Sequence, residues 1–158
     1  MPKISTANPS FFLIKSEPDK FSIDDLCKSK TTPWDGVRNF EARNKMKSMK
    51  LNDKCLFYHS NAKPPGIVGI AEVSTEAYPD YTALEKDGDH FDPKHTLDNP
   101  RWFMVDVSYL QHFKRMVTLK EIQAKDEFKE MELVKRGRLS VQSVSKEHFN
   151  SIVEMGEL

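Results

Sequence analysis

Three short segments of this chain combine an aromatic ring with cations, amides and hydroxyls. They are residues 15–18 (KSEP), 34–39 (WDGVRN) and 58–61 (YHSN). A protein that reads a nucleobase needs these groups: a flat ring for stacking, donors and acceptors for the base edge, and cations for the flanking phosphates. The three segments therefore predict a base-binding pocket, provided that the fold brings them together.

Each segment lies where a predicted element begins or ends. The apolar run 11–14 predicts a buried strand, and residues 55–59 and 67–73 predict two more strands around the turn at 63–66. Asn39 has the residue type of a helix N-cap. Polar side chains at element ends often contact ligands, so the segments are candidates for one site.

The rest of the chain alternates between strand and helix patterns. Capping signals at Ser22, Thr118 and Ser145 predict helix starts, and Gly156 predicts the end of the last helix. Residues 102–110 and 139–141 predict strands, a helical stretch covers the region of Phe128 and Met131, and residues 76–101 predict a long loop. About five strands and four helices indicate an α+β domain around a mixed, barrel-like sheet.

Length and charge bound the class of protein. The 158 residues fit one domain, which we place at residues 10–158 after a flexible arm at 1–9. The 24 basic and 24 acidic residues cancel, which argues against a non-specific nucleic-acid binder. Basic residues gather between 38 and 63 and acidic ones between 72 and 98, which predicts a basic and an acidic side, or two solvated faces.

The compartment is predicted from features that are missing. No apolar run is long enough to span a membrane, and the N-terminus has no secretory pattern. Cys27 and Cys55 are interpreted as small hydrophobic residues rather than as a disulfide. We expect an intracellular protein.

Catalysis and metal binding have little support in the sequence. No glycine-rich phosphate loop, nucleophile elbow or zinc-protease motif occurs. Asp89, His90, Asp92 and His95 could ligate a metal, but no helix sets their spacing, and a solvated loop is favoured. We therefore expect a non-catalytic protein without metal or cofactor. From the residues alone, Trp34 is equally well a core residue or a stacking wall.

Eight segments in order resemble the EVE-domain family: FFLIKSEP, FSIDDL, WDGVRNFEARN, FYHSN, GIVGIAEV, AYPD, NPRWFMVDV and RLSVQ, between about Phe11 and Met155. The resemblance implies a PUA-like fold, a mixed β-barrel of about five to six strands flanked by helices. It also implies similarity to YTH domains, which read N6-methyladenine in RNA. The family is associated with modified DNA bases, 5-hydroxymethylcytosine being favoured.

The resemblance also implies roles for the residues that match its motifs. These roles are a stacking wall at Trp34, base-edge contacts at Ser16, Asn39 and Ser60, a pocket shaped by Tyr58 and His59, phosphate or sugar contacts at Lys15 and Arg38, and closure of the site by Ser140 and Gln142. For Trp102 a core position is favoured over the site. Two departures occur: Ser143 replaces the family's proline, and the loop between residues 17 and 21 is shorter.

The function expected from the sequence is thus non-catalytic binding of nucleic acid with a flipped, modified base. DNA is favoured over RNA, a monomer over an oligomer, and the nucleus over the cytoplasm. Two alternatives stay open: a reader of modified RNA in the YTH manner, and an enzyme or enzyme subunit that acts on modified nucleotides.

Overall fold

A computed structural model describes residues 9–158 of the chain. The predicted arm, residues 1–9, lies outside the described residues except for residue 9. The strands are β1 (Phe11–Ser16), β2 (Thr31–Pro33), β3 (Lys54–His59), β4 (Gly66–Pro79), β5 (Phe103–Thr118) and β6 (Val141–Val144). The helices are α1 (Ile23–Ser29), α2 (Phe40–Ser48), α3 (Leu119–Ala124), α4 (Glu132–Lys135) and α5 (Lys146–Gly156), with short 3-10 turns η1 (Tyr81–Leu84) and η2 (Asp126–Phe128).

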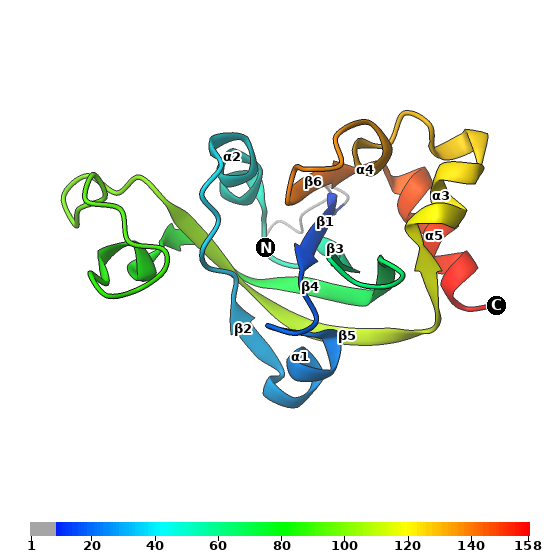
Figure 1. Ribbon diagram of the computed structural model, residues 1–158, viewed down its shortest axis with the longest axis horizontal. Helices are drawn as coiled ribbons and strands as arrows, with labels where there is room; N and C mark the ends of the chain where they lie inside the picture. The colour runs from blue at the N-terminus through cyan, green and yellow to red at the C-terminus, as the bar shows by residue number, and fades with distance from the viewer. Residues whose placement is uncertain (1–8) are drawn as a thin grey trace, which may run out of the picture.

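The six strands form one mixed sheet in the order β2-β5-β4-β3-β1-β6 (Figure 1). β1 runs parallel to β3, and the other neighbours are antiparallel. This confirms the α+β prediction, but closure into a barrel was wrong. β2 has three residues and β6 has four, each pairs along one side only, and they lie at opposite edges of the sheet.

The local capping signals predicted the helix starts correctly. The hydroxyl of Ser22 accepts the Asp25 N–H at 3.1 Å, and that of Thr118 accepts the Glu121 N–H at 3.1 Å. Ser145 caps α5 in the same way, with the His148 N–H as donor at 3.1 Å. Each cap satisfies an N–H that has no partner within its own helix, which is why these residue types are favoured there.

The predicted strands were too short, and one was missed. β4 continues through residues 76–79 of the predicted loop, because Tyr78 and Pro79 pair with the start of β5. β2 pairs with β5 more than 70 residues away, and nothing in its three residues signals that partner. The last strand was predicted at 139–141 and lies at 141–144.

The two faces of the sheet bury separate hydrophobic clusters. Phe12, Ile14 and Phe57 belong to one cluster, which also includes Trp34 and buried residues of α1 and α2. Leu13 and its neighbours on β3 belong to the other, which α3 and α5 cover. The alternation follows from the two-residue period of a strand.

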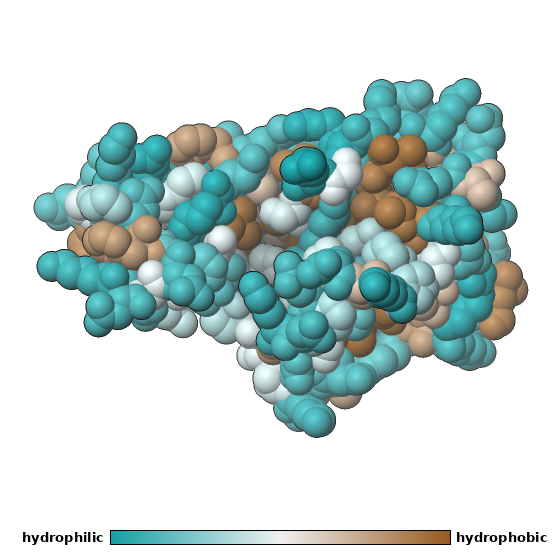
Figure 2. All heavy atoms as spheres, in the orientation of Figure 1, coloured by the Kyte–Doolittle hydropathy of each residue, from teal (hydrophilic) through white to brown (hydrophobic). Residues whose placement is uncertain are grey.

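The long segment between β4 and β5 projects at one end of the molecule, and α3 and α5 lie at the other end (Figure 1). Hydrophilic residues cover most of the face seen in this orientation, with hydrophobic residues in separate patches (Figure 2). Within residues 9–158, no helix is long and apolar enough to cross a membrane. Both cysteines are free, as predicted, and burial raises the pKa of Cys55 to about 12.

Candidate base-binding site

An open cavity of about 370 Å³ lies where β1, β2 and the turn before α2 meet. Five of the predicted site residues line it: Lys15, Ser16, Trp34, Arg38 and Ser140. The cavity is also lined by residues to which the sequence pattern gave no role, namely Phe21, Thr32, Pro33, Asp35, Gly36 and Val37. The first two polar segments thus meet as predicted, together with the residue that precedes β6.

Trp34 belongs to the core and to the cavity wall at once. Only 7% of its surface is exposed, and its indole meets Phe57 and Phe21 edge to face at centroid distances of 5.6 and 6.4 Å. Its backbone N–H donates to the carbonyl of Val105 at 2.7 Å. The two interpretations of Trp34 are therefore compatible, because a ring fixed by the core is a rigid surface for stacking.

Lys15 brings a cation to the cavity wall. Its ammonium donates to the carbonyl of Gly137 and lies 5.4 Å from the centroid of the Tyr58 ring. Burial lowers the pKa of Lys15 below its ordinary value. An ammonium held in this way can donate to a group inside the cavity.

The cavity also presents hydroxyl groups. Ser16 donates its hydroxyl hydrogen to the carbonyl of Phe21 at 2.6 Å, which leaves the lone pairs of its oxygen for a ligand. Ser140 is positioned by its carbonyl, which accepts the backbone N–H of Lys15 at 3.1 Å. The two serines therefore supply acceptors next to the ammonium.

Asp35 adds a carboxylate that lies within the predicted motif but had no predicted role. Partial shielding from solvent at the cavity wall, and then the nearby carboxylate of Asp80, raise the pKa of Asp35, whose residue is otherwise exposed. The next residue, Gly36, has φ +80°, and a Cβ there would lie 2.6 Å from the His90 ring. This glycine allows the chain to turn between the indole and α2.

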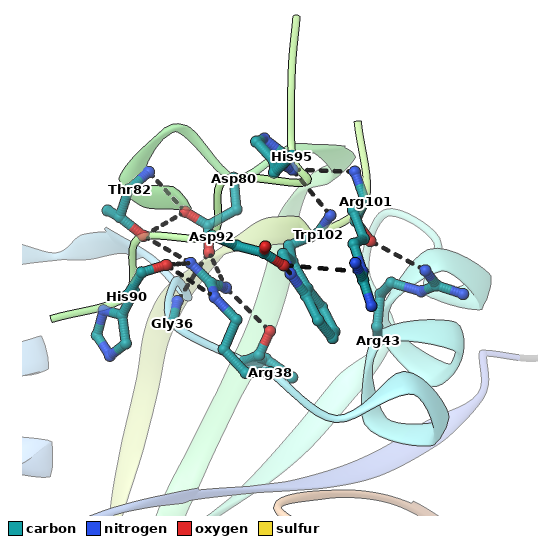
Figure 3. A network of polar contacts seen from close by, with 11 residues as sticks. Gly36, Arg38, Arg43, Asp80, Thr82, His90, Asp92, His95, Arg101 and Trp102 are labelled. Carbon is teal, nitrogen blue, oxygen red and sulfur yellow. Dashed lines mark hydrogen bonds and ion pairs between the residues drawn. The ribbon is translucent and has the colours of Figure 1, made fainter. Parts of the chain in front are cut away.

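Arg38 is engaged within the protein (Figure 3). Its five N–H contacts reach the Asp80 carboxylate at 3.0 Å, the Val37 carbonyl at 3.0 Å, the Thr82 hydroxyl at 3.3 Å and the His90 carbonyl at 2.8 and 3.1 Å. A guanidinium has five N–H groups, so none is left for a phosphate. In this structure Arg38 anchors the turn, and the phosphate or sugar contact expected of it from the sequence stays a prediction.

Asp80 is the buried partner in this network, with no exposed surface. Burial opposes its ionisation, but hydrogen bonds from Thr82, Gly36 and Arg38 outweigh it and hold the pKa of Asp80 below its ordinary value. The carboxylate thus joins the cavity turn to the start of the segment after β4.

Four other predicted site residues lie outside the cavity, in structural roles. Asn39 caps α2 by accepting the Ala42 N–H at 2.9 Å. His59 accepts the Ile23 N–H at 3.2 Å, and Ser60 donates its N–H to the Ser16 carbonyl at 2.9 Å. Tyr58 is buried beneath Lys15. These residues hold the strand ends and helix starts that shape the cavity without lining it.

Gln142 is buried outside the cavity, where its amide N–H groups donate to the Leu139 and Arg136 carbonyls at 2.9 and 3.3 Å. Its Oε1 has no hydrogen-bond partner among the described residues. Gln142 therefore positions the loop before β6 instead of closing the site directly.

Trp102 also lies outside the cavity, just before β5. Its indole N–H donates to Asp92 at 2.6 Å, and its backbone N–H donates to His95 at 3.1 Å (Figure 3). Its ring stacks on Phe40 at a centroid distance of 4.8 Å. His95 is 3% exposed, so the predicted solvated loop is in part a packed one. No group of three or more metal-ligating side chains is found between residues 9 and 158.

Comparison with known proteins settles the family. Residues 10–155 match the family described as EVE domain. The chain belongs to the EVE domain family. Thymocyte nuclear protein 1 of Rattus norvegicus is 43% identical over 94% of this chain and 74% of its own length, and that of Homo sapiens is 42% identical over the same shares.

Solved structures of similar chains have the same fold. A hypothetical protein from Leishmania major is 50% identical with a TM-score of 0.91, covering 94% of this chain and 95% of its own. The human THYN1 protein in complex with 5-methylcytosine-containing DNA is 41% identical with a TM-score of 0.89, covering 94% and 98%. The relatives are thus named as a nuclear protein and as a protein in complex with DNA.

Proposed function

We propose that this EVE domain binds DNA that carries a 5-substituted cytosine and holds the flipped base in the cavity at Trp34. The observation that carries the proposal is the cavity itself, which combines a rigid indole wall with a carboxylate, an ammonium and two hydroxyls. The human relative in complex with 5-methylcytosine-containing DNA, 41% identical to this chain, supports the choice of partner.

Stacking on Trp34 and edge contacts together offset the cost of flipping. Extruding a base costs a few kcal/mol, and one aromatic stack returns roughly 1–3 kcal/mol. The remainder would come from hydrogen bonds to the base edge. Because these terms nearly cancel, we expect modest affinity, and the modification is read as a difference in affinity.

Asp35 and Lys15 complement the edge of cytosine. The exocyclic amine of cytosine donates and suits a carboxylate, whereas thymine presents a carbonyl oxygen at the same position. We expect the Asp35 carboxylate to accept a hydrogen bond from the exocyclic amine. We expect the Lys15 ammonium to donate a hydrogen bond to an acceptor atom of the base. Both side chains line the cavity, so one base can meet both.

The finer prediction is a preference for 5-hydroxymethylcytosine, and it is based on the hydroxyl groups of the cavity. The oxygen of Ser16 can accept a hydrogen bond from a hydroxymethyl group, because its own hydrogen is donated to Phe21. Ser140 supplies a second hydroxyl on the cavity wall. We therefore expect 5-hydroxymethylcytosine to bind more tightly than 5-methylcytosine.

Titration of matched oligonucleotides tests the function. Single- and double-stranded DNA with cytosine, 5-methylcytosine or 5-hydroxymethylcytosine at one position would be titrated by fluorescence anisotropy. Burial of one methyl group predicts about fourfold tighter binding of 5-methylcytosine than of cytosine. Equal affinities for all three bases would overturn the proposal, and tighter binding of the matching RNA would replace DNA by RNA.

The variant Trp34→Phe, with Trp102→Phe as its matched control, locates the site. We expect about fivefold weaker binding of modified DNA for Trp34→Phe, because a smaller ring stacks less well. Trp102 lies outside the cavity, so its variant keeps the preference. Thermal unfolding of both variants shows whether the fold is intact.

The nuclear location and the monomeric state also belong to this proposal. The first is supported by the name of the relatives, thymocyte nuclear protein 1. Microscopy of the tagged chain tests the location, and sedimentation velocity with and without DNA tests the monomer.

A further inference from the structure

A second hollow of about 410 Å³ adjoins the base cavity. It is lined by Asn39, Lys135, Arg136, Gly137, Arg138 and Leu139. Arg38 and Ser140 line the base cavity, and their chain neighbours Asn39 and Leu139 line the second hollow. The two hollows therefore share walls made by the same two segments of chain.

Two side chains hold the carbonyl groups of the loop between α4 and β6. The Arg136 carbonyl accepts the Leu139 N–H at 3.0 Å and the amide of buried Gln142 at 3.3 Å. The Gly137 carbonyl accepts the Lys15 ammonium, which comes from the wall of the base cavity.

These contacts set the direction of the next two N–H groups. In a planar trans peptide the N–H points opposite to the carbonyl oxygen. The Gly137 N–H is therefore turned away from the buried Gln142, and the Arg138 N–H is turned away from Lys15. Within the described part of the chain, neither N–H has a hydrogen-bond acceptor. Residues 137 and 138 lie in a turn, and successive free N–H groups in a turn can form a concavity that suits an anion.

The charges around the loop leave one cation uncompensated. Lys135 pairs with Glu130 at 2.7 Å, and both N–H arms of Arg136 reach the Glu41 carboxylate at 2.7 Å. Arg138 is exposed and makes no ion pair with any residue from 9 to 158. One free guanidinium beside two free N–H groups matches the single negative charge of a phosphodiester.

We propose that the loop 136–138 binds a DNA phosphate next to the flipped nucleotide. The inference rests on the proposed function, since the base cavity shares its walls with this hollow, and one sugar links a base to its phosphate. Arg138 and the two N–H groups touch the phosphate. Lys15 and Gln142 act as positioning residues, because each holds one carbonyl of the loop.

The variant Arg138→Gln tests the charge, with Lys120→Gln on α3 as a control that removes the same charge outside the hollow. For Arg138→Gln we expect about tenfold weaker binding of modified and unmodified DNA alike, since a charge-assisted contact is lost. The slope of log K against log salt should become shallower by about one unit. The control should change neither quantity.

A methylphosphonate scan assigns the loss to one phosphate. A neutral methylphosphonate replaces each phosphate near the modified base in turn, and affinities are measured for wild type and Arg138→Gln. At one flanking position we expect the wild type to lose about tenfold and the variant to lose clearly less, because only the two N–H groups still contact that phosphate. Additive losses at every position would overturn the phosphate site.

The ratio of affinities for modified and unmodified DNA distinguishes a failure of the proposed function from a failure of the phosphate site. A wild type that shows no preference for the modified base contradicts the proposed function, whatever the scan shows. A wild type that keeps its preference while Arg138→Gln binds all oligonucleotides as the wild type does contradicts only the phosphate site.

Discussion

Asp35 and Arg38 lie three residues apart on the turn that forms the cavity wall, and their surroundings give them opposite tasks. All the contacts of the Arg38 guanidinium are with protein groups. Asp35 has a raised pKa because it is partly shielded from solvent at the cavity wall and because Asp80 lies nearby. Asp35 lines the cavity and its residue is exposed, so its carboxylate is open to a donor on a ligand, which makes Asp35 the better candidate for a base contact.

The variant Asp35→Asn tests this assignment through a pair of bases that differ at one position. 5-Methylcytosine and thymine carry the same methyl group but differ in the exocyclic amine or carbonyl. We expect the wild type to favour 5-methylcytosine by about tenfold. The amide introduced by the substitution can donate to the thymine carbonyl, so the ratio should fall towards one.

Anisotropy titrations with the two matched oligonucleotides measure that ratio. The variant Asp98→Asn serves as the control, because it removes the same charge from an exposed residue outside the base cavity. An unchanged ratio in Asp35→Asn would place the amine contact elsewhere.

At the scale of elements, the cavity depends on the parallel pairing of β1 and β3. Their carboxyl ends lie side by side, with Ser16 in register with His59. His59 then accepts the first N–H of α1 through Ile23. The end of β3 thus fixes the start of α1, and the cavity residue Phe21 lies just before that helix.

The pH dependence of stability tests this link. Burial lowers the pKa of His59 below its ordinary value of 6.5, against the opposing effect of Asp24 and with a smaller contribution from His112. The unfolded chain therefore binds the proton more readily than the folded one. The stabilisation is complete above pH 6.5 and is lost as the pH falls towards the lowered pKa.

The variant His59→Gln keeps an acceptor for Ile23 but does not titrate. Urea unfolding between about pH 7.5 and 5 should therefore show a smaller loss of stability for this variant than for wild type. The substitution His148→Gln on α5 is the control. Parallel curves for wild type and His59→Gln would contradict the role of His59.

At the scale of the whole molecule, Arg38 and Asp80 join the cavity turn to the segment between β4 and β5. Asp80 is fully buried, and it also accepts the Gly36 N–H at 2.8 Å. The other end of this segment is held beside α2 by the hydrogen bond from the Trp102 indole N–H to Asp92 (Figure 3). The acidic segment is thereby part of the support of the site.

The variant Arg38→Ala should destabilise the whole domain. Removal of one partner leaves a buried carboxylate without its cation, which costs about 3 kcal/mol in the free energy of unfolding. Arg43→Ala, whose partners are an amide and a carbonyl, should cost less in the same urea titration. Full stability of Arg38→Ala together with weaker DNA binding would contradict its role as an anchor.

The features determined by the sequence itself are those set by near neighbours. A cap depends on residues within one helical turn, so Ser22, Asn39, Thr118 and Ser145 marked their helices correctly. The ordered motifs predicted the family correctly. The motif around Trp34 predicted a segment that lines the cavity.

Only the tertiary structure decided the partners that lie far apart in the chain. Arg38 meets Asp80 across 42 positions, so the residue expected to contact a phosphate or sugar is an anchor of the cavity turn in the structure. The lengths and places of β2 and β6 left the sheet open, and the turn at Gly36 placed Asp35 on the cavity wall while Asn39 became a cap. Residue types state what a side chain can do, but its direction and its partners depend on register and packing, which arise only when distant segments meet.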